Sequence, residues 1–200
     1  MDSQKVIIIH GCPGTGKTLV SEKLSRLLKA IHINISEIAL REELFIGFDK
    51  ERESFILDEE SLKNRIIDLI VKSESLVIVE GHHANIVPPN YVIKVFVLRR
   101  HPVELEKVLE LRGWKKEKIL ENVLAEILDY CVVVALETYG SEKVVEVDVT
   151  NRNVDDVVME ILSELYVNKI KSNYHIDWIK VLKHEGLLEK YIMNFSSSQS

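Results

Sequence analysis

Residues Val6–Thr18 read VIIIHGCPGTGKT and join a run of β-branched residues to a glycine-rich turn. A continuous apolar run of this length is typical of a buried parallel strand. The turn, Gly11–Thr18, matches the pattern G-x-x-x-x-G-K-[ST], which average composition would produce by chance in about one chain of this length in a hundred. Apolar residues after Gly16 then recur at helical spacing. Strand, turn and helix therefore follow the order that a phosphate-binding loop (P-loop) requires.

The residue types in this turn suit the wrapping of phosphate oxygens. Gly14 and Gly16 can adopt the positive φ angles that let backbone N–H groups surround an anion, and the helix N-terminus adds its dipole. Lys17 would reach the β- and γ-phosphates, and Thr18 would offer its hydroxyl to Mg²⁺. The motif alone does not separate a kinase from an ATPase or a GTPase, although the sequence contains no guanine-reading N-K-x-D.

The rest of the chain alternates strand-like and helix-like patterns, which predicts an α/β fold with a five-stranded, mostly parallel sheet flanked by helices. The expected strands are 6–9, 31–35, 76–79, 92–98 and 144–149. The expected helices are 16–30, 36–44, 59–73, 103–111, 115–139 and 154–167, with Ser36 and Asp58 as N-caps. Gly47 and Asp49 predict a loop between the second and third helices.

The chain divides into a catalytic domain, residues 1–167, and a C-terminal appendage, residues 168–200. After a polar junction, 168–173, the stretch 174–192 has an amphipathic pattern. This stretch either docks on its own domain or serves as a partner helix for protein or RNA. The last residues, Phe195–Ser200, are polar and are expected to be frayed.

The charge balance restricts the class of partner. Lys and Arg number 26 against 32 Asp and Glu, a net charge of −6, which argues against a general nucleic-acid coat or a membrane-surface protein. Any RNA contact would be local or through a protein. Two separate cysteines and an N-terminal apolar run too short for a signal peptide predict a soluble, cytoplasmic protein with no redox or zinc motif.

Further motifs follow the P-loop in a characteristic order: INISEIALREELFIGFD, ILDEESL, VIVEGHH, VFVLRR, LELRGWKKEKILEN and VDVTNRNVDD. With them the chain, from about Lys5 to Val167, resembles the small adenylate kinases of the isoenzyme-six type, also called coilin-interacting nuclear ATPases. The resemblance implies a nucleoside-monophosphate-kinase fold with a very short lid. It also implies ATP and Mg²⁺ as cofactors, phosphoryl transfer to AMP, ATP hydrolysis, and a role in maturing small-subunit ribosomal RNA through a platform ribosomal protein.

The resemblance also assigns residues to sites. The ATP phosphates would be held by the P-loop residues Gly14, Thr15, Gly16, Lys17, Thr18 and Leu19, and clamped by Arg112 at the start of a lid spanning about 111–121. The acceptor nucleotide would lie against residues 34–57, with Asn34, Ser36 and Arg41 as contacts. Asn151 and Arg152 would lie beside the adenine base.

Four further positions in the motifs have candidate roles. Glu80 stands where the family usually has aspartate, yet its carboxylate can still hold Mg²⁺ together with Thr18. His82 is either a polar loop histidine or a residue that positions water. Leu40 stands where adenylate kinases place a phosphate-binding arginine, and Arg41 is displaced from it by about 100° on a helix. Arg99 ends a buried strand on the ligand side and is a further candidate for phosphate binding.

These observations favour a Mg²⁺-dependent phosphotransferase that converts ATP and AMP into two ADP and also hydrolyses ATP, with Lys17, Arg112, Glu80 and His82 as its catalytic residues. The alternative is an ATP-switched ribosome-assembly factor that binds a ribosomal protein, its kinase activity secondary. A kinase for another small molecule, including another nucleoside monophosphate, is the third hypothesis.

Overall fold

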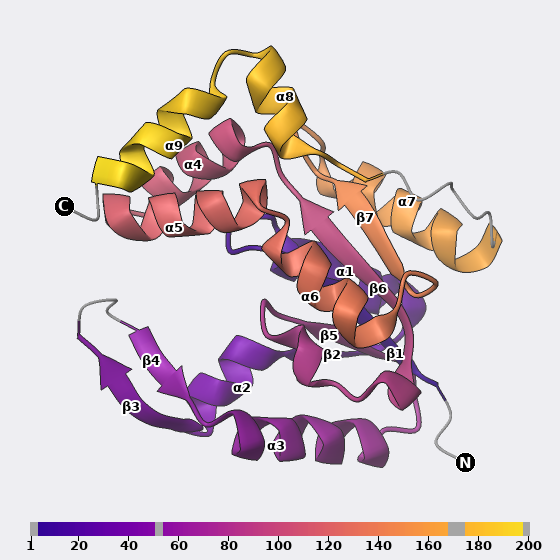
Figure 1. Cartoon of the computed structure of the whole chain (residues 1–200). Coiled ribbons are helices and arrows are strands. Elements are labelled where there is room, and N and C mark those ends of the chain that lie inside the picture. The colour runs from indigo at the N-terminus through magenta and orange to yellow at the C-terminus, as the bar shows by residue number, and fades with distance from the viewer. Residues whose placement is uncertain (1–3, 51–53, 168–174, 198–200) are drawn as a thin grey trace.

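A single parallel sheet forms the centre of the molecule (Figure 1). The computed structural model describes residues 4–50, 54–167 and 175–197. The sheet has the strand order β2-β5-β1-β6-β7, and every neighbouring pair is parallel. Its strands are β1 (Val6–His10), β2 (Ile31–Asn34), β5 (Val77–Glu80), β6 (Val92–Arg99) and β7 (Val144–Asp148). The predicted α/β fold with five parallel strands is confirmed.

Helices cover both faces of the sheet and bury alternate residues of each strand. Ile7 and Ile9 of β1 pack in a core with α1 (Lys17–Leu28) and α7 (Val154–Val167). Val6 and Ile8 point to the other core, shared with α3 (Glu59–Lys72), α5 (Lys116–Ile127) and α6 (Tyr130–Tyr139). All five residues of β1 are buried, as expected for a strand with neighbours on both sides and helices on both faces.

The segment predicted as a loop around Gly47 contains a separate two-stranded antiparallel hairpin. It consists of β3 (Phe45–Asp49) and β4 (Ser54–Leu57). Phe55 lies opposite Phe48 in the strand register, with ring centroids 5.3 Å apart, and its ring also lies 4.3 Å from that of Phe45. Such aromatic contacts between strands stabilise hairpins. The hairpin follows α2 (Ile35–Arg41), which begins one residue before the predicted cap Ser36, because the side chain of Asn34 accepts the N–H of Glu37 and caps the helix.

The long helix predicted over 115–139 is wrong, because it is broken into α5 and α6. Asp129 lies between them in the left-handed region, with φ of 57°. Its carboxylate is bonded to Arg99 from the end of β6, so this contact holds the break in place. The helix before it, α4 (Pro102–Leu111), ends close to the predicted residue.

The C-terminal helices α8 (Trp178–His184) and α9 (Leu188–Ser197) pack on the same body, over α4 and α5 (Figure 1). Trp178, Leu182 and Tyr191 are buried there. Residues 195–197, predicted to be frayed, continue α9, whereas 198–200 and the predicted junction 168–173 lie outside the described residues. Two short 3-10 turns, η1 (Ala84–Ile86) and η2 (Pro89–Tyr91), complete the chain path. Within the described ranges, no helix has both the length and the apolar character needed to cross a bilayer.

Candidate active site

The P-loop lies at the carboxyl end of β1, where parallel sheets bind their ligands. Gly11, Gly14 and Gly16 have φ angles of 140°, 95° and 91°, which L-residues with side chains rarely adopt. A Cβ on Gly11 would also lie 2.6 Å from the carbonyl oxygen of Leu98, so no larger residue fits there. The glycines therefore form a tight cradle whose backbone N–H groups can meet phosphate oxygens.

Lys17 lies across this cradle. Its Nζ donates to the carbonyl oxygens of Gly11 and Cys12 at 2.9 and 3.0 Å. Desolvation lowers the pKa of Lys17, while the nearby carboxylate of Glu80 opposes that effect. Thr15 donates its hydroxyl to Cys12 O at 2.9 Å and so braces the loop, and the exposed Thr18 lies in the first turn of α1.

The side chain of Leu19, by contrast, is 61% exposed on α1 and bounds a separate hollow with Leu27 and Val154. Its predicted contact with phosphate is therefore restricted to its backbone.

Glu80, at the end of β5, is a buried carboxylate held in a fixed position. It is 1% exposed, and its Oε1 accepts hydrogen bonds from Asn34 Nδ2 at 2.9 Å and His32 Nε2 at 3.1 Å. The register of β5 places Glu80 beside Ile9 of β1 and Asn34 of β2, at the edge where the P-loop begins. The carboxylate also lies close enough to Lys17 for its charge to raise the pKa of that lysine.

The same contacts correct the prediction for Asn34. Its amide oxygen caps α2 and its amide nitrogen binds Glu80, so both polar atoms are engaged away from an acceptor. His32, which no motif singled out, binds the same carboxylate. It lies two residues before Asn34 on β2, so the two side chains point to the same face of the sheet.

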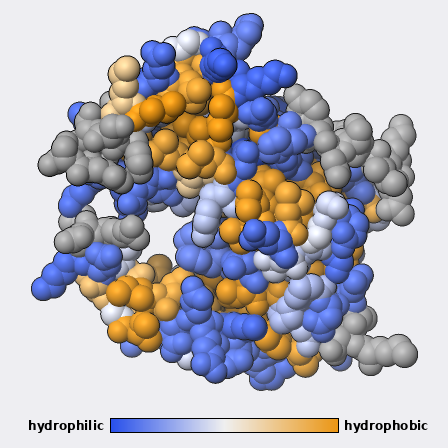
Figure 2. Space-filling model, in the orientation of Figure 1, coloured by the Kyte–Doolittle hydropathy of each residue, from blue (hydrophilic) through white to orange (hydrophobic). Residues whose placement is uncertain are grey.

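A cavity of about 390 Å³ opens beside the P-loop. It is bounded by Pro13 of the loop, by His82 and His83 after β5, and by three further segments. These contribute Ser36, Ala39 and Leu40 from α2, Phe45, Ser54, Phe55 and Leu57 from the hairpin, and Trp114, Lys118 and Asn122 from the lid. Figure 2 shows hydrophobic surface on the hairpin, below the hollow that separates it from the lid. A small organic acceptor fits a cavity of this size and lining.

The two neighbouring positions on α2 have different surroundings. Leu40 lines the cavity, whereas Arg41 is exposed and its guanidinium donates to Glu42 Oε1 at 3.3 Å. The displacement by one residue thus turns Arg41 away from the cavity, and its predicted contact with the acceptor is wrong for this structure. Ser36, the other predicted contact on α2, does line the cavity.

His82 lies where the cavity meets the P-loop. Its ring is stacked near that of His83, with centroids 4.1 Å apart. Although the side chain reaches solvent, desolvation together with the nearby His83, Lys17 and His10 lowers the pKa of His82 well below its ordinary value. A neutral imidazole at this position can accept a hydrogen bond and so orient a water molecule.

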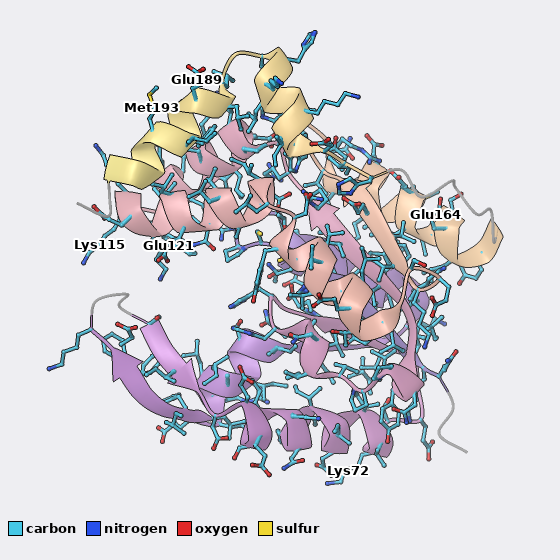
Figure 3. The ribbon with its side chains drawn as sticks, in the orientation of Figure 1. Lys72, Lys115, Glu121, Glu164, Glu189 and Met193 are labelled. Carbon is cyan, nitrogen blue, oxygen red and sulfur yellow. The ribbon has the colours of Figure 1, made fainter. Side chains whose placement is uncertain are left out.

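The lid begins where α4 ends. Arg112 is exposed at the C-cap of α4, and its charge is close enough to Lys17 to lower the pKa of that lysine. Lys118 lies 4.7 Å above the ring of Trp114 and adds a positive charge to the cavity wall. Figure 3 shows Lys115 and Glu121 at this end of the molecule, directed toward the hairpin side. The segment predicted as the lid thus places Lys118 in the wall of the cavity and Arg112 near Lys17.

Arg99 belongs to a buried ion cluster and not to the ligand site. It is 1% exposed, and its guanidinium binds Glu126 Oε1 at 2.8 Å as well as Asp129 and Glu146. Although burial disfavours its charge, these carboxylates raise the pKa of Arg99. The prediction that Arg99 binds phosphate is therefore wrong, because its donors are engaged by the protein.

The next residue, Arg100, is the one that faces the P-loop. Its Nη2 lies 3.9 Å from the position of a Cβ on Gly16, and Nη1 pairs with Glu104. Arg99 is the last residue of β6 and is buried, whereas Arg100 follows the strand and lies on the side of the P-loop. The sequence indicated an arginine near the P-loop at the end of this strand, but it did not show which of the two adjacent arginines faces the loop.

The segment predicted beside adenine starts after β7. The backbone N–H of Asn151 donates to Glu104 Oε2 at 2.9 Å, which leaves the exposed side chain of Asn151 beside the arginine–glutamate pair. Arg152 turns away, because its guanidinium binds Asp148 O at 2.8 Å and Glu160 Oε2 at 2.5 Å. Its predicted contact with the base is therefore replaced by a contact with α7.

Comparison with known proteins gives a consistent result. A family model described as an AAA domain matches residues 7–129. A protein of Methanocaldococcus jannaschii named "Putative adenylate kinase" is 38% identical over 172 residues, which cover 86% of this chain and 92% of that protein. A protein of the same name from Sulfurisphaera tokodaii is 33% identical over 198 residues, covering 98% of each chain.

Solved structures support the fold. A shikimate kinase from Acinetobacter baumannii, in complex with shikimate, has a TM-score of 0.58 at 20% identity and matches 85% of this chain and 97% of its own. A thymidylate kinase from Candida albicans has a TM-score of 0.55 at 16% identity, over 84% of this chain and 93% of its own. At this identity the likeness shows the fold alone, which is that of the P-loop kinases.

Proposed function

This chain belongs to the AAA-domain family and to the family of archaeal proteins that carry the name adenylate kinase, and from that premise we propose that it is a Mg²⁺-dependent nucleoside monophosphate kinase. Its reaction would convert ATP and AMP into two ADP. The observation that carries the proposal is the cavity beside the P-loop, because Pro13 of the P-loop forms part of its lining together with His82, which follows β5. An enzyme that only hydrolyses ATP needs no organic acceptor site there.

The side chains support charge stabilisation during in-line transfer of the γ-phosphoryl group. Lys17 would leave the carbonyls of Gly11 and Cys12 and follow the β- and γ-phosphates. Arg112 would clamp the same phosphates from the lid. Since an oxygen of the acceptor phosphate attacks directly, no nucleophile from the protein is required.

The residues at the loop also suit Mg²⁺, which the P-loop kinases use with ATP. Thr18 offers a hydroxyl and Glu80 a fixed carboxylate, and hard oxygen donors are the ligands this ion prefers. Bound there, Mg²⁺ would neutralise charge that develops on the phosphates. Asn34 and His32 would act as positioning residues, because they hold the Glu80 carboxylate.

We also infer a slower ATP hydrolysis by the same site. A water molecule in the cavity could take the place of the acceptor, and the neutral His82 is situated to orient it. The lid would normally exclude such water by closing over bound acceptor.

A panel of acceptors tests the proposal. ADP production from ATP is measured with AMP, CMP, dAMP and no acceptor, for the native chain and for Lys17→Ala. We expect AMP to accelerate ADP production strongly, and Lys17→Ala to reduce it by on the order of 10²-fold or more. Equal turnover with and without every acceptor would contradict the kinase assignment and favour an ATPase.

A second candidate function is an ATP-switched assembly factor for the small ribosomal subunit. The resemblance to the isoenzyme-six adenylate kinases suggests this role, which stays a prediction. Exposed Ile46, Phe48, Phe55 and Ile56 on the hairpin support it, since clustered apolar surface is typical of protein contacts. Binding to the platform ribosomal protein, measured with and without ATP, tests this candidate. A complex that is insensitive to nucleotide, or no complex, would contradict it.

A further inference from the structure

The chain has two cysteines, 119 positions apart, and the fold brings them together behind the P-loop. Cys12 lies within the loop and Cys131 in the first turn of α6. Their sulfur atoms are 3.6 Å apart, and both residues are buried, with exposed fractions of 2% and 4%. Buried thiols are commonly inert packing groups, so the pair needs a closer examination of its surroundings.

The surroundings shift the pKa values of the two thiols in opposite directions. The hydrogen bond from Cys12 lowers the pKa of Cys131, burial opposes this, and His10 and Lys17 lower it further. The start of a helix also favours a thiolate. The pKa of Cys12 is raised by the same pairing and by burial. One sulfur is thus suited to be the reactive thiolate and the other to be the thiol that resolves it.

His10 supplies a proton acceptor. Its Nδ1 is 2.9 Å from Gly81 O, a contact in which Nδ1 donates, and its Nε2 is buried with no hydrogen-bond partner within the described residues. The unpaired nitrogen of a neutral imidazole can accept the proton of a nearby thiol. A core that only needed apolar filling would not combine two thiols with this ring.

We propose that Cys12 and Cys131 form an intramolecular disulfide when the protein meets a peroxide, and that this site controls the P-loop. The Cys131 thiolate attacks one peroxide oxygen, the O–O bond breaks, and a sulfenic acid and a first water result. Cys12 sulfur then attacks the sulfenic sulfur, the S–O bond breaks, and a second water leaves. Two thiols lose two electrons, one hydrogen peroxide gains them, and both thiol protons end in water.

The disulfide would distort the P-loop. Its effect on ATP binding and phosphoryl transfer rests on the proposed function. The sulfur atoms must approach from 3.6 Å to about 2.05 Å. Cys12 carries the carbonyl that accepts hydrogen bonds from Lys17 Nζ, Thr15 N and Thr15 Oγ1. Moving Cys12 toward α6 therefore displaces both the loop and its lysine, so ATP binding and phosphoryl transfer should weaken.

The test begins with chemistry that does not depend on catalysis. The full chain is treated with hydrogen peroxide, free thiols are counted, and peptides are mapped without reduction. We expect both thiols to disappear, the chain to stay monomeric on non-reducing gels, and one cross-linked peptide pair to contain Cys12 and Cys131. In the control Cys131→Ala, no cross-linked pair forms. Surviving thiols, disulfides between chains, or higher sulfur oxides without a cross-link would overturn the proposal.

Activity is the second readout. ADP production by the oxidised chain should fall by on the order of 10²-fold, as expected when a catalytic loop moves by about 1 Å, and dithiothreitol should restore it. Cys131→Ala should resist this reversible loss. A disulfide that forms without changing ADP production would overturn the control of the P-loop. If the chain never phosphorylates AMP, the proposed function fails, yet thiol counts and peptide maps still decide whether the disulfide forms.

Discussion

The indole N–H of Trp178 donates a 2.9 Å hydrogen bond to Glu126 Oε1, deep beneath the C-terminal helices. Arg99 donates to the same oxygen at 2.8 Å, and its guanidinium lies 5.9 Å from the Trp178 ring. Burial raises the pKa of Glu126, which the two donors counteract. The C-terminal appendage therefore completes the ion cluster that holds the break between α5 and α6.

Trp178→Ala should destabilise the whole chain. The substitution removes a side chain that is only 3% exposed and costs about 3–5 kcal/mol, as for other buried aromatic residues. Trp178→Phe should cost less, since it keeps much of the packing and loses the hydrogen bond. Denaturant unfolding measures both, with the exposed Ile179→Ala as a control near zero. A Trp178→Ala chain of native stability would show that α8 is not part of the cooperative unit.

Glu80→Gln should reduce phosphoryl transfer and raise the Mg²⁺ concentration needed for half-maximal rate. The amide keeps the size of the side chain but removes the charge, so we expect a loss on the order of 10²-fold. Glu80→Asp should recover part of it. Titrating Mg²⁺ during ADP production measures the effect, and the exposed Glu60→Gln on α3 serves as the control. Unchanged Mg²⁺ dependence in Glu80→Gln would remove Glu80 from the metal site.

Leu40→Arg should lower KM for AMP, because it places a guanidinium in the wall of the acceptor cavity. A charge-assisted bond to phosphate contributes about 1.5–3 kcal/mol, so a tenfold lower KM is a reasonable size. Arg41→Ala should leave KM almost unchanged, since Arg41 points outward to Glu42. Initial rates over a range of AMP concentrations compare the pair. A large rise in KM for Arg41→Ala would mean that α2 rotates on binding.

The contact of His175 predicts a pH dependence of stability. Its hydrogen bond to Glu146 Oε1, 2.8 Å long, raises the pKa of His175 above its ordinary value, and Asp129 adds to this. Folding therefore favours the protonated form. The stabilisation is fully present below about pH 6.5 and is lost as the pH rises through the raised pKa of the folded state. Because His175 is half exposed, the effect should stay below about 1 kcal/mol.

Thermal unfolding at about pH 6 and about pH 8.5 measures this effect against His175→Gln. The difference between the native chain and the variant should shrink at the higher pH. A constant difference would show that protonation of His175 does not contribute.

The sequence predicted the parts of the fold that local patterns specify. Val6–Ile9, the glycine spacing and the stripe of α7 each carry a periodicity or motif within one element, and all lie as expected. The break at Asp129 was missed because its cause, the bond to Arg99, lies 30 residues away. The hairpin was missed because the contacts of Phe55 with Phe45 and Phe48 join two short segments that, taken alone, show only an irregular apolar pattern.

The candidate site divides in the same way. Four predicted site residues lie near one another at the carboxyl edge of the sheet: Lys17, Glu80, His82 and Ser36. Each of them ends or follows a strand, or lies in the first turn of a helix, at that edge. The structure differs from expectation at Arg99, Asn34, Arg41 and Arg152. At each of them, hydrogen bonds to other groups of the protein decide where the polar side chain points. Cys12 and Cys131 offered no local signal at all, since only the fold makes them neighbours.

The central position of β1 has a consequence for the newly synthesised chain. Val6–His10 is synthesised before its partners in the sheet, Val77–Glu80 and Val92–Arg99, which follow about 70 to 90 residues later. Pairing across such separations closes slowly, and an unpaired apolar strand is prone to aggregate. Because β6 also supplies Leu98, against which Gly11 packs, the cradle cannot take shape before that strand arrives. ATP can therefore stabilise only a chain whose synthesis has passed Arg99, and the first strand must be shielded until then.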